Sequence, residues 1–230
     1  MPSLDRLPTI LRRTAGLAAL TLLLAACGGG GSADAGNTNT YDLDSAISRL
    51  LLNGPPAASL TASFSGVQFS LSQSYVRLAD ASFEGALRQA LRETTTIIGG
   101  SENQTVVSTM YFSTNPFVDH GSVEQDGARS VLTPTGNLPS FARVGDSGPL
   151  NTGTSYTDAS KQVITATVTN TWSLDADTAT TALACLRSVI RQVGAATPIT
   201  GAQCWRIDTA GNVLGSQVTI GFNGNTLQFR

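Results

Sequence analysis

Residues 161–174, KQVITATVTNTWSL, contain the pattern that decides the fold class. Threonine stands at every second position from residue 165 to residue 171, and alanine, valine and asparagine stand between. A period of two places neighbouring side chains on opposite faces of an extended strand, and β-branched residues favour that conformation. The stretch therefore predicts a β-strand with one buried face.

Period-two alternation recurs along much of the chain. Residues 67–72 alternate apolar and polar side chains within a predicted strand at 60–78. Residues 105–112 are predicted as a further strand, with Gly99-Gly100 before them as a hairpin turn. Asn223-Gly224 is a strong hairpin signal near the end of the chain. The short strands predicted in that region are 204–208, 213–222 and 226–229.

One short helix and several unclear segments interrupt this pattern. Residues 42–52, DLDSAISRLLL, place leucine and isoleucine at helical intervals, with an aspartate as cap and Asn53-Gly54-Pro55-Pro56 as stop signal. Residues 83–93 and 178–193 fit either a helix or a strand, and the Val-Ile centre of the second favours a strand. Proline and glycine punctuate residues 115–154, which we interpret as a long connection with one or two short strands.

These patterns predict a mainly β fold, an antiparallel meander or sandwich with one short N-terminal helix. An α+β fold with helices near 83–93 and 178–193 is the alternative. We expect residues 41–230 to form a single β-rich domain. A faint internal similarity raises a duplicated unit as a further interpretation, with similar lobes at 41–114 and 155–230.

The start of the chain carries targeting signals. Arg6, Arg12 and Arg13 form a positive segment, and an uncharged apolar run follows from residue 14 to residue 26. This length suits the apolar core of a signal peptide and is shorter than the roughly 20 residues that span a bilayer. The run ends in Leu24-Ala25-Ala26-Cys27, which resembles the bacterial lipobox.

The lipobox resemblance implies that residues 1–26 are a signal peptide and that the sulfur of Cys27 carries lipid. The chain thereby resembles the uncharacterised lipoproteins of Gram-negative bacteria. Residues 27–40 hold the lipidated N-terminus and a small, polar, glycine-rich segment, which predicts a flexible tether with a reach of roughly 20 Å. By the enterobacterial sorting rule Gly28 favours the outer membrane, so we expect a lipid-anchored protein on its periplasmic or surface face.

The charge of the chain argues against nucleic-acid binding, and its cysteines predict a disulfide. Without the three arginines and one aspartate of the leader, 11 basic and 15 acidic residues remain, a net charge of −4. Lys161 is the only lysine, so the clustered cations of a nucleic-acid-binding protein are missing. In an oxidising compartment Cys185 and Cys204 are predicted to form a disulfide, with two free buried thiols as the alternative. Trp172 and Trp205 are expected to pack in the core against its sulfurs.

The sequence contains no recognisable catalytic or metal-binding motif. His120 is the only histidine, and its sequence neighbour Asp119 is a poor triad partner, so we expect a solvated loop histidine. One histidine leaves no zinc site. Asp175 and Asp177 are interpreted as turn residues that bind their own backbone. We therefore predict no enzyme activity, no catalytic or metal site and no cofactor.

Three hypotheses about function follow. The favoured one is a binding or structural accessory protein, anchored to the membrane through Cys27, that recognises an envelope partner through an exposed edge strand or residues 115–154. The second is a periplasmic hydrolase that cleaves glycan with two carboxylates roughly 5–10 Å apart. The third is a carrier of a small apolar ligand in a barrel or sandwich. The glutamates available to the second are Glu84, Glu93, Glu102 and Glu124.

Overall fold

The computed structural model describes residues 37–100 and 102–230, and it confirms a mainly β fold with one short helix. Within these ranges twelve antiparallel strands form one meander, in which each strand pairs with the next along the chain. They are β1 (Ala58–Phe64), β2 (Val67–Phe83), β3 (Ala86–Gly99), β4 (Glu102–Ser113), β5 (Val118–Glu124), β6 (Arg129–Pro134), β7 (Ser147–Tyr156), β8 (Ile164–Ala176), β9 (Thr181–Gln192), β10 (Ile199–Asp208), β11 (Val213–Phe222) and β12 (Asn225–Phe229).

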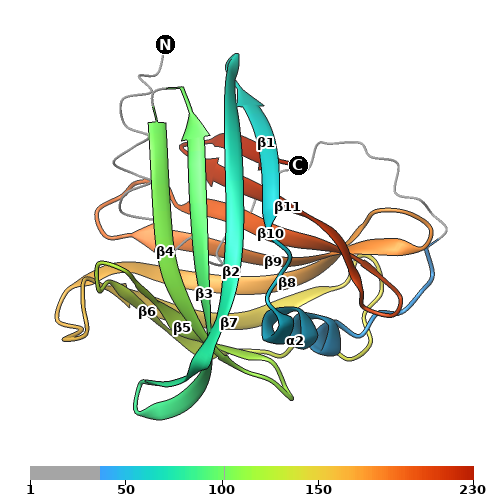
Figure 1. Cartoon of the computed structure of the whole chain (residues 1–230), viewed down its shortest axis with the longest axis horizontal. Coiled ribbons are helices and arrows are strands. Elements are labelled where there is room, and N and C mark those ends of the chain that lie inside the picture. Colours follow the sequence, from blue (N-terminus) through green and yellow to red (C-terminus); the bar gives the residue numbers. More distant parts are fainter. Residues whose placement is uncertain (1–36, 101) are drawn as a thin grey trace.

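The sheet curls until its first and last strands meet. Thr61 of β1 and Arg230, directly after β12, exchange two backbone hydrogen bonds, with N–O distances of 3.0 and 3.1 Å. Figure 1 shows β2, β3 and β4 in front and the orange strands β8 to β10 behind them. The curled sheet encloses an interior, and alternate side chains of each strand face into it.

Two-residue turns with left-handed backbone join several of the hairpins. Asn223 and Gly224 have φ values of 48° and 76°, which confirms the predicted Asn-Gly hairpin between β11 and β12. Glu84 and Gly85, with φ values of 51° and 79°, make the same kind of turn between β2 and β3. Such turns match the twist of the flanking strands, so they fix the register of each hairpin.

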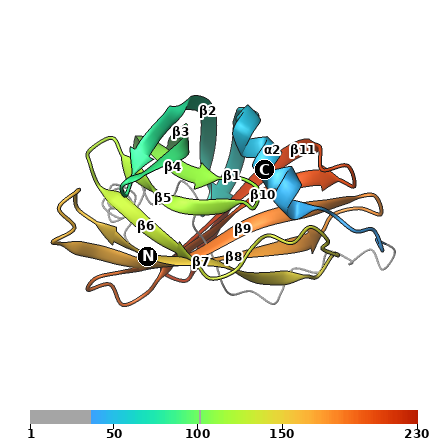
Figure 2. The same ribbon diagram turned by 90° about the horizontal axis from the view of Figure 1, so that it is seen from below.

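Helix α2 (Leu43–Asn53) confirms the predicted helix and lies across one end of the curled sheet (Figures 1 and 2). Asp42 caps it by accepting a hydrogen bond from the backbone nitrogen of Ser45 at 3.0 Å, and Gly54 with a φ of 77° ends it. Its apolar face enters the helix-side cluster, which also contains side chains of β3, β4 and β7 to β10. The main members are Leu43, Ile47, Leu51, Leu91, Met110, Phe112, Leu150, Trp172, Leu186 and Trp205.

Two other apolar clusters lie elsewhere in the interior. The far cluster is formed by β1, β2, β11 and β12 at the opposite end, with Leu60, Ala62, Phe69, Leu71, Val218, Leu227 and Phe229. A smaller group on β8 and β9 contains Ala166, Val168 and Ile190.

Three sequence-based expectations need correction or refinement. Residues 83–93 and 178–193 lie mostly in β3 and β9, so the alternative with helices there is wrong, whereas the preference for a strand in the second segment is confirmed. Residues 115–154 contain β5, β6 and most of β7. Their prolines misled the prediction because they lie where strand pairing allows them: Pro134 ends β6, and Pro149 stands at an irregularity in the β7–β8 register.

The signal peptide, Cys27 and most of the tether fall outside the described residues. None of the helices in the described part of the chain has the length and hydropathy needed to cross a lipid bilayer. The duplicated-lobe interpretation stays a prediction.

Candidate functional site

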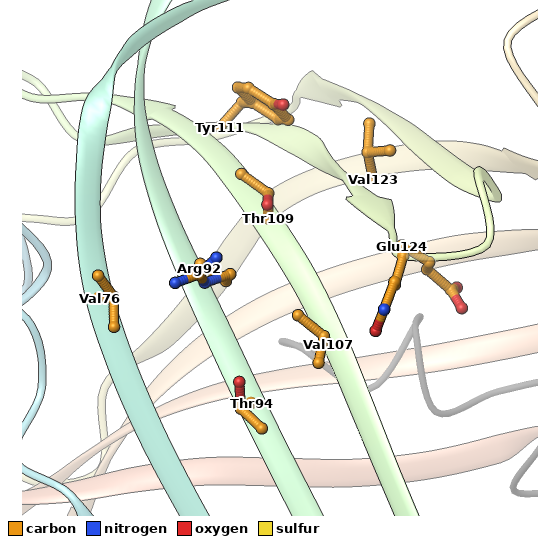
Figure 3. Close-up of a pocket in the computed structure, with 9 residues that line it drawn as sticks. Val76, Arg92, Thr94, Val107, Thr109, Tyr111, Val123 and Glu124 are labelled. Atoms are coloured by element: carbon orange, nitrogen blue, oxygen red, sulfur yellow. The ribbon is translucent and has the colours of Figure 1, made fainter.

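The outer face of β2 to β5 forms a hollow of about 480 Å³, called here the outer hollow. Val76, Arg92, Thr109 and Val123 stand side by side across the four strands, because the register pairs each with the next. The residues before and after Arg92 and Thr109 are buried, so the side chains of this row face outward. Figure 3 shows them together with the other lining residues that it labels, Thr94, Val107, Tyr111 and Glu124.

Arg92 is the cationic centre of the outer hollow. Its side chain is exposed and makes no hydrogen bond or ion pair with any residue that the structure describes. Val76, which is 46% exposed, and Val107 provide apolar walls around it. Tyr111 is held by a stack on Phe83, with ring centroids 4.5 Å apart and planes inclined by 10°. An unpaired guanidinium in such a place can bind a carboxylate or phosphate through two parallel hydrogen bonds.

A second feature lies inside the sheet and is called here the polar layer. Its side chains are buried and face inward from eight strands, at a level between the helix-side cluster and the two other clusters. On β8, for example, Asn170 stands between Val168 and Trp172. The members are Gln73, Glu93, Ser108, Ser130, Asn151, Ser155, Asn170, Ser188 and Gln203.

Glu93 is the ionisable group of the polar layer. One carboxylate oxygen accepts hydrogen bonds from the Gln73 amide and the Thr95 hydroxyl, both at 2.9 Å. The Gln73 amide also donates to the side-chain oxygen of Gln203 at 3.2 Å. Burial raises the pKa of Glu93 to about 7, although these hydrogen bonds and one from Tyr75 oppose the rise. Burial and the adjacent Glu93 also raise the pKa of Tyr75.

The opposite wall of the polar layer carries a neutral network. The Asn170 amide donates to the Asn151 side-chain oxygen at 2.6 Å, and the Ser188 hydroxyl donates to the Asn170 side-chain oxygen. Two buried atoms of the layer, Gln73 Oε1 and Asn151 Nδ2, have no partner among the described residues. Because a buried polar atom without a partner is unfavourable, each such atom calls for an explanation.

A third feature, the rim hollow, has a volume of about 510 Å³ beside the β5–β6 turn and β7 to β9. Its wall includes the acids Glu124 and Asp126 and the apolar side chains of Ile164 and Val193, which are 50% and 70% exposed. Burial, and then the negative charge of Asp126, raise the pKa of Glu124 to about 7. Ser155 of the polar layer also lines this hollow, so the hollow adjoins the interior.

The structure joins the two predicted disulfide cysteines. Cys185 on β9 and Cys204 on β10 are register partners, and their sulfurs are bonded at 2.10 Å. Trp172 and Trp205 are buried as expected, but in the helix-side cluster, whereas the cysteines belong to a separate cluster. The expectation that the tryptophans pack against the sulfurs is therefore wrong, because neighbouring residues of a strand face opposite sides.

His120 lies on strand β5 rather than in a loop, which corrects the sequence-based expectation. Its Nε2 is 3.1 Å from the Ser113 hydroxyl, and burial together with Arg88 lowers its pKa. The buried Asp119 side chain accepts a hydrogen bond from the backbone nitrogen of Gly121 at 3.0 Å instead of orienting the imidazole. Burial raises the pKa of Asp119 to about 7.

Asp177 lies in the turn between β8 and β9 as predicted, whereas Asp175 belongs to β8, and both acids bind arginines rather than their own backbone. Asp175 pairs with Arg187, and Asp177 accepts hydrogen bonds from Arg206 at 2.7 and 2.9 Å. Among the glutamates, Glu84 pairs with Arg129 and Lys161 on the protein surface. Within residues 37–100 and 102–230 no group of three histidines, cysteines or acids could hold a metal ion.

Sequence reasoning missed the outer hollow and the polar layer. The sequence signal for the layer is a polar side chain within an inward apolar series. Gln73 follows Phe69 and Leu71 in this way, and Asn170 stands between Val168 and Trp172. Comparison with known proteins gives no match to a protein-family model, to a curated protein or to a solved structure.

Proposed function

We propose that this chain is a lipid-anchored envelope protein that binds a partner through the outer hollow. The observation that carries the proposal is the unpaired, exposed guanidinium of Arg92 at the centre of a concave and partly apolar surface. A cation with apolar walls can supply both charge recognition and buried contact area at one place.

The curled sheet also limits how a partner can bind. Proteins with a free edge strand can add a strand of their partner by backbone hydrogen bonds. Here Thr61 and Arg230 pair the first strand with the end of the chain, which removes backbone groups from one possible edge. About half of residues 115–154, the other expected recognition surface, belongs to strands of the same sheet. Recognition through side chains on a sheet face is therefore favoured.

The predicted anchor and tether fit this role. A lipid on Cys27 would hold the folded part at the membrane, and the tether would let the outer hollow turn towards a neighbouring protein. The net charge of −4 after the leader makes a carboxylate-rich partner unfavourable at long range, except near exposed cations such as Arg92. Arg92 would therefore determine where an acidic group of the partner docks.

The test is crosslinking of the tagged full-length protein in intact envelopes, comparing Arg92→Glu with Arg191→Glu. Arg191 is a matched control, because it is also exposed and belongs to β9, far along the sheet. We expect the crosslinked partner to be lost in Arg92→Glu and retained in Arg191→Glu. A Cys27→Ala variant separates the contribution of the anchor. Equal capture by both arginine variants would refute the outer hollow as the binding surface.

One observation favours hydrolysis as a second candidate function. Glu124 and Asp126 line the same rim hollow, and the pKa of Glu124 is raised to about 7 while it lies beside a second carboxylate. A proton-donating carboxylic acid next to an ionised carboxylate is the arrangement that glycosidases use. The test is release of reducing sugar from cell-wall glycan by the purified protein. Activity that disappears in both Glu124→Gln and Asp126→Asn would establish this candidate in place of the first.

A further inference from the structure

The polar layer holds a buried acid, Glu93, that has no cationic partner among the residues that the structure describes. The groups that contact or perturb Glu93 are Gln73 and Tyr75 from β2 and Thr95 from its own strand. The nearby cation Arg77 is bound elsewhere, to the carbonyl oxygens of Leu78 and Ala90 and to a surface acid. The donors around Glu93 are therefore neutral, and a bound cation would find an uncompensated carboxylate there.

A second, independent observation points to the same place. Gln73 Oε1 is buried and has no hydrogen-bond partner among the described residues, so this acceptor lacks a donor beside Glu93. Gln73, Glu93 and Gln203 are each 6% exposed, so the free acceptor and the carboxylate are both more than nine-tenths buried. A ligand with several N–H donors would satisfy the free amide oxygen and the carboxylate together.

The surroundings of the polar layer restrict the ligand further. Apolar side chains lie on both sides of the layer, Leu71 in the far cluster and Leu91 in the helix-side cluster. An alkyl group would make apolar contacts with them, whereas a highly charged ion beside them would be unfavourable. The rim hollow adjoins the layer through Ser155 and carries Glu124 and Asp126. Two acids beside the interior would raise the local concentration of cations and repel anions.

We propose that the polar layer is a binding site for a small organic ammonium ion, held by the Glu93 carboxylate and the free amide oxygen of Gln73, with its alkyl part against the flanking apolar clusters. This site is independent of the outer hollow and of the partner proposed to bind there. The ammonium ion supplies a cationic partner for the Glu93 carboxylate and a hydrogen-bond donor for Gln73 Oε1. Gln203, whose side-chain oxygen accepts from Gln73 at 3.2 Å, holds the amide in its orientation.

The experiment is isothermal titration of the purified full-length protein in detergent with n-propylammonium chloride at pH 8. The neutral 1-propanol, of the same chain length, and sodium chloride serve as comparison ligands. We expect saturable binding of propylammonium and none of propanol or sodium. Because the pKa of Glu93 is about 7, the wild-type affinity should be about tenfold weaker at pH 6, where roughly a tenth of the carboxyl groups are ionised.

Two substitutions locate the binding site. Glu93→Gln keeps the size of the side chain and removes its charge, so it should abolish propylammonium binding. The control Asp146→Asn removes a charge from an exposed acid whose side chain, among the described residues, binds only the backbone nitrogen of Arg143, so it should leave binding unchanged. The wild-type pH dependence tests the proposal even where Glu93→Gln fails to fold. Absence of saturable wild-type binding, equal binding of propanol, equal binding of sodium, or binding that survives in Glu93→Gln would each overturn the proposal.

Discussion

Replacing Glu93 by glutamine should change how the stability of the protein depends on pH. Burial raises the pKa of this carboxyl from its ordinary value of 4.5 to about 7. Between these two values the unfolded chain loses the proton while the folded protein keeps it, so ionisation of the unfolded state lowers folding stability as pH rises. The difference between the two pKa values corresponds to about 3 kcal/mol of folding stability. This stability is fully present below pH 4.5 and is lost above about pH 7.

The measurement is guanidinium unfolding of the wild type and Glu93→Gln at intervals from pH 4.5 to pH 8. Glutamine does not titrate, so the free energy of unfolding of the variant should rise relative to that of the wild type by about 3 kcal/mol across this range. At pH 4.5 the variant should be equally stable or slightly less stable. Asp119 and Glu124, whose pKa values are also raised to about 7, should keep part of the pH dependence in the variant. Parallel stability curves for the two proteins would refute the assignment of a raised pKa to Glu93.

Further predictions concern the disulfide, the core and one turn of the backbone. Non-reducing mass spectrometry should show the peptides of Cys185 and Cys204 linked, and alkylation of both thiols without reductant would contradict this. Reduction should lower the free energy of unfolding by about 3 kcal/mol, because the disulfide closes a loop with a sequence separation of 19. Trp205→Ala should lower the free energy of unfolding by about 3–5 kcal/mol, whereas Leu214→Ala on an exposed position should change it by less than about 0.5 kcal/mol. Gly121→Ala should destabilise the sheet by more than about 1 kcal/mol in thermal unfolding, because Gly121 has a φ of 129° and an added Cβ would lie 2.0 Å from the Ser130 backbone oxygen.

Local patterns predicted much of the fold. Period-two alternation identified β8, the Asp42-capped helix was placed within one residue of its observed start, and Asn223-Gly224 marked the last hairpin. These features depend on short-range physics, in which a strand period, a capping carboxylate and a left-handed turn each leave a local signature. The closure of the curled sheet involves pairing between Thr61 and Arg230, which lie at opposite ends of the domain in sequence. A local sequence pattern cannot predict such a long-range pairing.

The candidate sites were less predictable for the same reason. The outer hollow assembles Val76, Arg92, Thr109 and Val123 from four strands, and none of these residues forms a motif with the others in sequence. The inward position of Glu93 could be derived only after the register of β3 was known. The sequence did contain one kind of signal for the polar layer, namely polar side chains at inward-facing positions that are otherwise apolar. This signal can be interpreted only after the strands have been aligned.

The polar layer is difficult to explain by stability alone. An ionised Glu93 opposes folding by about 3 kcal/mol at neutral pH, and buried polar atoms without partners add to that cost. Leucine or methionine in place of Gln73 and Glu93 would extend the apolar clusters on either side, and such replacements of buried polar groups are often neutral or stabilising. A layer that contributes acceptors from several strands, yet leaves one of them free beside a carboxylate, is therefore better explained as a site for a ligand than as part of the core. If an apolar Gln73→Leu, Glu93→Leu double variant proves more stable than the wild type and no longer binds propylammonium, the same residues will have been shown to lower stability and to carry the site.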